Sequence, residues 1–235
     1  MTDAREQILG NLRRSLKRTT SEGPETEAAR TRLAEHRPNL IPARAASLDP
    51  EGRIALFIEM AREVAATVDR IAGMDAVPGA VADYLAQHNL PSELVATPDP
   101  ALEAIPWHER PTLAIRKGIV EPSDGVGITA CFAGIAETGT LMLLSGPESP
   151  TRNNFLPDTH IVVLRADQVI PTYEEGWMRL RTMKTLQTGH FTMPRTVNFI
   201  TGPSRTADIE LKIELGAHGP RRLHILVVDD EPAPA

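Results

Sequence analysis

The sequence is short of several residue classes, and each shortage excludes a kind of protein. Its 235 residues include one cysteine, Cys131, and only 4% are aromatic. One thiol can neither form an internal disulfide nor hold an iron–sulfur cluster, which needs several cysteines. We expect Cys131 to be buried and unreactive, because it lies in an apolar run. With few aromatic rings, the core must consist mainly of alanine, valine, isoleucine and leucine.

Basic residues are outnumbered as well. Lysine and arginine total 25 against 31 acidic residues, which gives a formal net charge of −6. Such a chain gains little from releasing counterions on DNA, so nucleic acid is not an expected partner. No segment approaches the ~20 apolar residues of a membrane span, and the N-terminus lacks an apolar signal-peptide stretch. These absences predict a cytoplasmic location and place any one-electron chemistry in a partner.

The N-terminal segment has the pattern of an amphipathic helix over residues 2–18. Its apolar residues recur along one face, at Ile8, Leu9, Leu12 and Leu16. Residues 19–24 have the composition of a linker, so we assign residues 1–24 to a helical extension. The apolar stripe must pack on its own chain, on a sister subunit in a homo-oligomer, or on another protein. These alternatives stay open.

Residues 25–229 are predicted to form one α/β domain, followed by a frayed tail at 230–235. Asp49 and Pro50 are a helix-start signal, with aspartate as the cap and proline at the first helical position. A further amphipathic helix is expected over residues 77–88.

Four short apolar runs indicate buried strands in the second half of the chain. They lie at residues 139–144, 160–164, 197–200 and 223–228. Continuous apolar runs are typical of strands covered on both faces, so we predict a largely parallel sheet. A helix over residues 172–187 supplies a crossover connection.

The polar loops after two of these runs, residues 145–154 and 201–208, are candidate ligand sites. In open α/β sheets, ligands bind outside the carboxyl ends of the strands. In the second loop, Gly202 allows close approach of the backbone, while Ser204 and Thr206 supply hydroxyls. Arg205 carries a planar fork that suits a carboxylate or phosphate.

Two acidic residues, at the end of this loop and just after it, give Arg205 another interpretation. Asp208 and Glu210 would share one face of an extended chain, and one of them is expected to pair with Arg205 or with Arg152 of the first loop. An anion site and a turn closed by an internal salt bridge are equal alternatives here.

Glu137 is a lone acid among apolar neighbours and small residues. It is followed by Thr138, Gly139 and Thr140. A carboxylate in this setting is either a hydrogen-bond anchor for the turn or a group for acid–base or nucleophilic catalysis. We therefore name Glu137 as the candidate catalytic residue and keep the structural anchor as the alternative.

The remaining signals are weaker. Gly125 and Gly127 resemble a phosphate loop faintly, without the full glycine pattern or its lysine. The histidines are scattered, so no metal site is predicted. His160 heads an apolar strand and is expected to be a satisfied structural histidine, whereas His218 lies in a glycine-flanked loop and is a better candidate for ligand binding.

Taken together, these motifs resemble the LUD domain of the LutC/YkgG family. The resemblance is carried, in order along the chain, by residues 124–129, 135–141, Arg152, 156–161, 202–210 and 216–220. Asn153-Asn154-Phe155 departs from the small or hydroxyl residues expected before Leu156-Pro157. The resemblance covers the C-terminal half closely and the N-terminal helices loosely.

The resemblance implies a Rossmann-like sheet of the NagB/RpiA/CoA-transferase type. It also implies a non-redox subunit of an L-lactate-oxidising complex, which binds a small carboxylate or phosphate-bearing ligand and docks to partners that carry iron–sulfur clusters. No cofactor is expected in this chain itself. Two alternatives are kept: a free-standing transferase or isomerase that uses Glu137, and a purely structural assembly factor.

Overall fold

The computed structural model describes residues 4–16, 23–38, 41–188, 193–206, 214–216 and 218–229. The chain divides into two compact units, Met1–Leu40 and Ile41–Ala235. The first unit contains helices α1 (Ala4–Ser15) and α2 (Pro24–Glu35), and neither helix contains a buried residue. The predicted N-terminal helix is thus present. A domain boundary at residue 24 stays a prediction.

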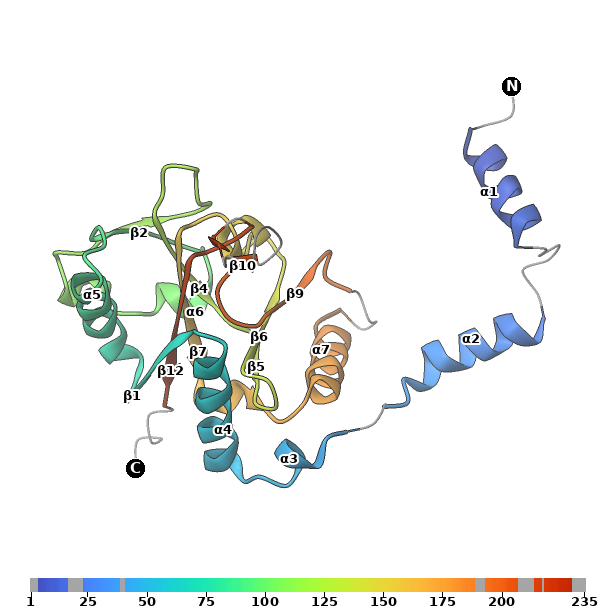
Figure 1. Ribbon diagram of the computed structural model, residues 1–235, viewed down its shortest axis with the longest axis horizontal. Coiled ribbons are helices and arrows are strands. Elements are labelled where there is room, and N and C mark those ends of the chain that lie inside the picture. The colour runs from blue at the N-terminus through green and yellow to red at the C-terminus, as the bar shows by residue number, and fades with distance from the viewer. Residues whose placement is uncertain are drawn as a thin grey trace. The chain divides into compact units, whose positions relative to one another are not determined.

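A six-stranded parallel sheet forms the centre of the second unit (Figure 1). Across the sheet, the strands are β1 (Thr67–Ile71), β12 (Arg222–Val228), β7 (Thr159–Arg165), β4 (Val126–Ala130), β2 (Glu93–Ala96) and β3 (Ala114–Lys117). Every neighbouring pair runs parallel. All six strands therefore begin at the same edge, which we call the amino edge.

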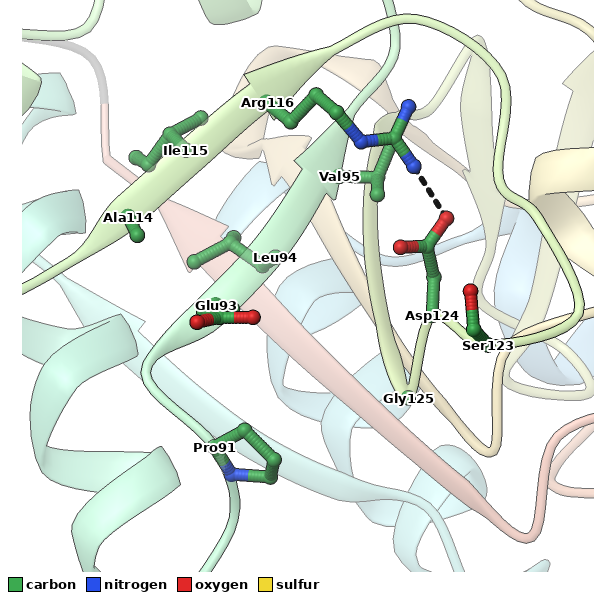
Figure 2. Close-up of a pocket in the computed structure, with 10 residues that line it drawn as sticks. All are labelled: Pro91, Glu93, Leu94, Val95, Ala114, Ile115, Arg116, Ser123, Asp124 and Gly125. Carbon is green, nitrogen blue, oxygen red and sulfur yellow. Dashed lines mark hydrogen bonds and ion pairs between the residues drawn. The ribbon is translucent and has the colours of Figure 1, made fainter.

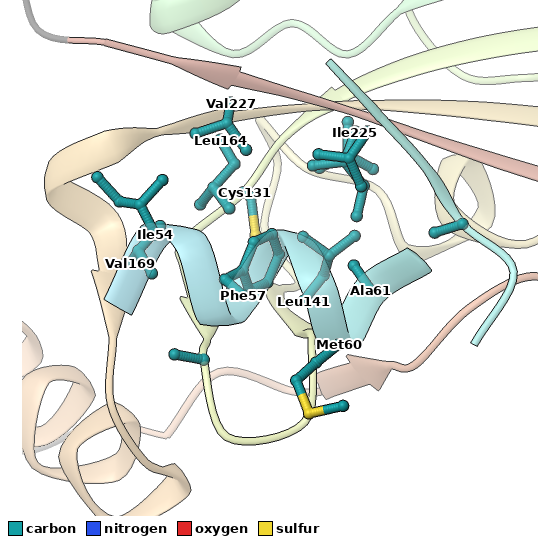
Figure 3. Packing of buried hydrophobic residues seen from close by; sticks show 14 of the residues in the cluster. Ile54, Phe57, Met60, Ala61, Cys131, Leu141, Leu164, Val169, Ile225 and Val227 are labelled. Atoms are coloured by element: carbon teal, nitrogen blue, oxygen red, sulfur yellow. The ribbon is translucent and has the colours of Figure 1, made fainter. Parts of the chain in front are cut away.

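Helices cover the two faces of this sheet. Side chains of β7 alternate between two cores: Val162 and Leu164 pack with helix α4 (Pro50–Glu63), whereas Ile161 and Val163 pack with α5 (Val77–Gln87). Figure 3 shows α4 with Phe57 and Ala61 among the strand residues of the first core. Asp49 caps α4 as predicted, since its side chain accepts a hydrogen bond from Gly52 N at 2.8 Å.

A second, four-stranded sheet corrects part of the strand prediction. Its order is β8 (Val169–Ile170), β5 (Ala133–Ile135), β6 (Thr140–Leu144) and β9 (Val197–Ile200). Two of the four apolar runs form β6 and β9, which pair antiparallel rather than parallel. The reason is that β6 is covered on both faces, with Leu141 and Leu143 in one core and Met142 in another. Burial on both sides produces a continuous apolar run whatever the strand direction.

Shorter elements and one further helix complete the described chain. Helix α7 (Tyr173–Thr188) connects β8 to β9, close to the predicted bounds. The short elements are α3 (Ala43–Ala46), α6 (Pro100–Glu103), η1 (Met74–Ala76), η2 (Trp107–Glu109), η3 (Thr151–Asn154), η4 (Ala166–Gln168), β10 (Arg205–Thr206) and β11 (Glu214–Leu215). Within the described ranges, no helix has the length and apolar character needed to cross a bilayer. The predicted α/β class, with a largely parallel sheet and N-terminal helices, is confirmed.

Candidate ligand site

A recess of about 230 Å³ lies where three segments meet near the amino edge of the parallel sheet. Asn154 and Phe155 come from the segment that leads into β7, and residues 218–220 from the one that leads into β12. The end of β9 and the loop after it contribute Phe199, Ile200, Thr201, Gly202 and Ser204. The two polar loops were expected at the carboxyl ends of parallel strands, but they follow β6 and β9 of the second sheet and return to the edge where β7 and β12 begin.

Asn154 is the residue in this recess that the sequence did not single out. Its side chain is fully buried, and neither the amide oxygen nor the amide nitrogen has a hydrogen-bond partner in the protein. Buried polar groups are nearly always paired, because an unpaired one costs roughly 1–3 kcal/mol. Asn154 is among the residues that line the recess, so it brings an unpaired, covered amide donor and an unpaired, covered amide acceptor to the wall of the recess.

Ser204 joins the two loops that close the recess. Its backbone N–H donates to Pro220 O at 2.9 Å, and its carbonyl accepts from Gly216 N at 3.0 Å. Its hydroxyl oxygen accepts from the backbone N–H of His218 at 3.3 Å, so the hydroxyl proton is left to donate elsewhere. The structure thus brings three predicted residues, Gly202, Ser204 and His218, to one recess.

A cluster of four hydroxyls stands behind one wall of the recess. Thr201 lines the wall, and its Oγ1 lies 2.7 Å from that of the buried Thr140. Thr140 Oγ1 is in turn 2.7 Å from Thr138 Oγ1 and 2.9 Å from the hydroxyl of Tyr173, and Thr138 is 3.0 Å from Tyr173. The predicted Thr138 and Thr140 therefore reach the recess only through Thr201.

Glu137 serves the start of helix α7. Its Oε1 accepts a hydrogen bond from the backbone N–H of Tyr173 at 3.0 Å, and its own N–H donates to Pro171 O. A carboxylate is favourable at a helix N-terminus, where the backbone N–H groups are otherwise unpaired. Glu137 is not among the residues that line the recess. This geometry matches the structural anchor that we kept as the alternative to catalysis.

Two glycines fix the approach of these loops to the end of helix α4. Gly139 has φ +63°, and a Cβ there would lie 2.2 Å from Ala61 N. Gly202 has φ +80°, and a Cβ there would lie 2.3 Å from Val64 O. Only glycine adopts these conformations at such close approach without strain. Gly202 does make a close backbone approach, but the backbone it approaches is the protein's own.

Arg205 contacts the carbonyl of Val64, which Gly202 also approaches. Its Nη2 donates to Val64 O, the C-cap of α4, at 2.9 Å. Cations are favourable at a helix C-terminus, so the arginine stabilises the loop that carries Ser204. The suggested pairing with Asp208 or Glu210 lies outside the described residues, as does the side chain of Thr206. Arg152 is exposed in η3, two residues before Asn154, and forms no ion pair with a described residue.

The remaining predicted residues lie elsewhere. Gly125 borders a separate recess of about 410 Å³ on β2 and β3, where Arg116 points toward Asp124 and forms an ion pair with it (Figure 2). Asp124 also accepts a hydrogen bond from Glu121 N at 2.6 Å, so its carboxylate is already paired with groups of the protein. Gly127 packs against Pro157, whose Cγ would lie 3.0 Å from an added Cβ.

Cys131 and His160 are buried titratable groups that lie outside the recess. Burial raises the pKa of the Cys131 thiol to about 12, and its Sγ donates to Ala133 O, as expected of an inert cysteine. His160 bonds Thr129 through Nε2 at 2.8 Å, but its Nδ1 has no partner, so it is only half satisfied. Burial lowers its pKa to about 3. Among the described residues, no three histidine, cysteine or acidic side chains gather as a metal site.

Comparison with known proteins shows what the chain is similar to. The profile of the LUD domain matches residues 123–228, which include β4, β7, β12 and the recess. "Lactate utilization protein C" from Geobacillus sp. is 36% identical over 105 residues, which are 45% of this chain and 42% of the relative. An uncharacterized protein from Neisseria meningitidis is 40% identical over 110 residues, 46% of this chain and 45% of the relative. Residues 123–228 of the chain are thus similar to the LUD domain, and the relatives matched there include lactate utilization protein C.

The matched part of the chain spans less than half the length of those two relatives. A longer match is found with Escherichia coli YkgG, which is 27% identical over 239 residues, covering 97% of this chain and 99% of the relative. A crystal structure of a DUF162 family protein from Deinococcus radiodurans covers 77% of this chain and 99% of its own, with a TM-score of 0.57 and 23% identity. That likeness supports the fold.

Proposed function

We propose that this protein is a non-redox component of a lactate-utilization system, which binds a small carboxylate in the recess beside Asn154. The observation that carries the proposal is the pair of unpartnered amide atoms on this buried asparagine. The names of the Geobacillus relative and of others, such as the Bacillus subtilis protein, support lactate utilization as the context.

The size of the recess and its hydrogen-bond donors favour a small anion. About 230 Å³ is below the ~300–1,000 Å³ typical of sites for drug-sized ligands. Ser204 Oγ and Asn154 Nδ2 are donors suited to a carboxylate, and the cations Arg152 and Arg205 lie in the flanking segments. Phe155 and Phe199 supply apolar surface for a short carbon chain.

Electron transfer belongs to partners in this proposal. Cys131 is the one cysteine in the sequence, and burial keeps its thiol protonated. Iron–sulfur clusters, which need several thiolates, would therefore be held by other proteins that dock to this chain. The transferase alternative has less support, because Glu137 already accepts a bond from Tyr173 N and does not line the recess.

Calorimetric titration of the full chain with L-lactate, pyruvate and inorganic phosphate tests the ligand site. We expect a carboxylate to bind, and Asn154→Ala and Ser204→Ala to weaken that binding by at least about tenfold, the effect of losing one charge-assisted hydrogen bond. Ser123→Ala, in the separate recess beside Asp124, is the matched control and should bind like the unchanged protein. Absence of binding at millimolar concentration, or equal loss in the control, would contradict the proposal.

The partner part needs a separate experiment. When the tagged protein is purified from its source organism grown on L-lactate, proteins that contain iron and acid-labile sulfide should co-purify with it. The same preparation from cells grown without lactate is the control. Partners free of iron in both preparations would count against a role beside iron–sulfur proteins.

A further inference from the structure

We infer that the recess selects a small hydroxy acid over the corresponding oxo acid, and that Tyr173 sets this preference without lining the recess. The inference rests on the proposed function, since it names the ligand class of the same site. It comes from the number of protons available in the hydroxyl cluster of Thr138, Thr140, Tyr173 and Thr201.

The cluster has as many contacts as protons. Its four O···O contacts are Thr138–Thr140, Thr138–Tyr173, Thr140–Tyr173 and Thr140–Thr201, at 2.7 to 3.0 Å. Each contact needs one proton, and each hydroxyl has one to donate. All four protons are therefore used inside the cluster. Because Thr201 takes part in a single contact, its proton must be the one donated to Thr140.

This assignment fixes what Thr201 presents to the recess. With its proton directed at Thr140, its remaining capacity is that of an acceptor. A ligand hydroxyl can donate to it, whereas a keto oxygen facing it would place two acceptors together. The amide oxygen of Asn154, which is covered but has no partner in the protein, is a second acceptor at the wall of the same recess. Asn154 Nδ2 and the Ser204 hydroxyl remain as donors for the carboxylate.

Tyr173 is a positioning residue in this scheme. It lies at the start of α7, held by the bond from its N–H to Glu137, and its hydroxyl closes the ring with Thr138 and Thr140. Removing that hydroxyl leaves three protons for two contacts. Thr138 can then donate to Thr140, and Thr140 to Thr201, which frees the Thr201 proton to point into the recess. The preference against a keto oxygen would then disappear.

The test compares the binding of L-lactate, pyruvate and propionate to the full chain by calorimetry. In the unchanged protein we expect L-lactate to bind at least about tenfold more tightly than pyruvate or propionate, because each lacks the donor. In Tyr173→Phe the ratio of lactate to pyruvate affinity should fall toward one, through a gain for pyruvate. Tyr84→Phe changes the other tyrosine, on α5, and should keep the original ratio.

Thr201→Val gives an independent reading at an exposed position. It should lower lactate affinity to the level of propionate. Equal or tighter binding of pyruvate by the unchanged protein would overturn the inference while leaving a carboxylate site in place. An unaltered ratio in both Tyr173→Phe and Thr201→Val would also overturn it. Failure of all three acids to bind would remove the proposed function and this selectivity with it.

Discussion

Two neighbouring regions of this protein treat their polar side chains in opposite ways. In the hydroxyl cluster, Thr138, Thr140, Tyr173 and Thr201 satisfy one another within the protein. In the segment from residue 154 to 160, Asn154, Thr159 and His160 are all fully buried, and each has at least one polar atom without a partner.

The difference separates groups that hold the fold from groups that are free to hold something else. A satisfied network stabilises and orients its members, whereas an unsatisfied buried group weakens the fold and persists more readily where it has another use. By this criterion the sequence motif around Glu137 is a scaffold. Asn154, which precedes β7, is the better candidate for ligand binding.

The largest expected effect is on the scaffold. Gly139→Ala would place a Cβ 2.2 Å from Ala61 N at φ +63°, so helix α4 or the turn must move. We expect the free energy of unfolding to fall by about 4 kcal/mol or more, measured by urea denaturation. Gly146→Ala is the control, because nothing lies within 4 Å of its added Cβ. A Gly139→Ala protein as stable as Gly146→Ala would show that the turn is not fixed by α4.

The second prediction uses pH to probe the segment from residue 154 to 160, whose buried polar atoms lack partners. Burial lowers the folded-state pKa of His160 to about 3, below the ~6.5 of an unfolded histidine. Between these values the unfolded state binds the extra proton, so stability is lost as the pH falls below ~6.5 and changes little above it. At pH 5 the loss from this one group is about 2 kcal/mol.

Urea denaturation at pH 5 and pH 7.5 measures this loss. His224, whose pKa burial lowers to about 4, adds an effect of the same sign. His160→Gln should therefore flatten the pH dependence by about 2 kcal/mol without abolishing it. The exposed His108→Gln is the control and should leave the slope unchanged. An unaltered slope in His160→Gln would mean that the imidazole is already protonated or hydrated in the fold.

Within the satisfied cluster, Thr140 has the most contacts to lose. Thr140→Val keeps the shape of the side chain but removes a hydroxyl that contacts Thr138, Tyr173 and Thr201. We expect a loss of about 2 kcal/mol in the free energy of unfolding, because the partner hydroxyls are left unpaired. Thr182→Val, on the exposed face of α7, is a control with the same change and little expected cost. Equal stabilities would indicate that water replaces the missing hydroxyl.

The sequence predicted much of the scaffold and little of the distinction between these regions. Periodicity and caps located α4, α5 and α7, and Gly202 was recognised as a special backbone position, whereas Gly139 was not. Burial on both faces hid the antiparallel pairing of β6 and β9. The spacing of apolar residues in the sequence indicates whether a residue is buried. Whether its polar atoms are hydrogen-bonded depends on contacts between segments that are distant in the sequence. The only sign of Asn154 was its departure from the family pattern.

The smallest change in stability is expected at Asn154 itself, and it gives the sharpest comparison with its neighbour. Asn153 is equally buried, but its Oδ1 accepts from Val120 N at 2.9 Å and its Nδ2 donates to Gly118 O at 2.8 Å. Asn153→Leu breaks both bonds and should lower the free energy of unfolding by about 2 to 3 kcal/mol. Asn154→Leu breaks none, so its free energy of unfolding should stay within about 0.5 kcal/mol of the unchanged protein or rise.

Urea denaturation of the two adjacent variants, with the same substitution at the same burial, decides between these outcomes. Equal losses would mean that Asn154 has a structural partner after all, and the criterion that separates scaffold from site would fail at the residue on which it depends most. A stable Asn154→Leu protein that no longer binds a carboxylate would instead show that this asparagine was retained for its ligand, since the fold gains nothing from it.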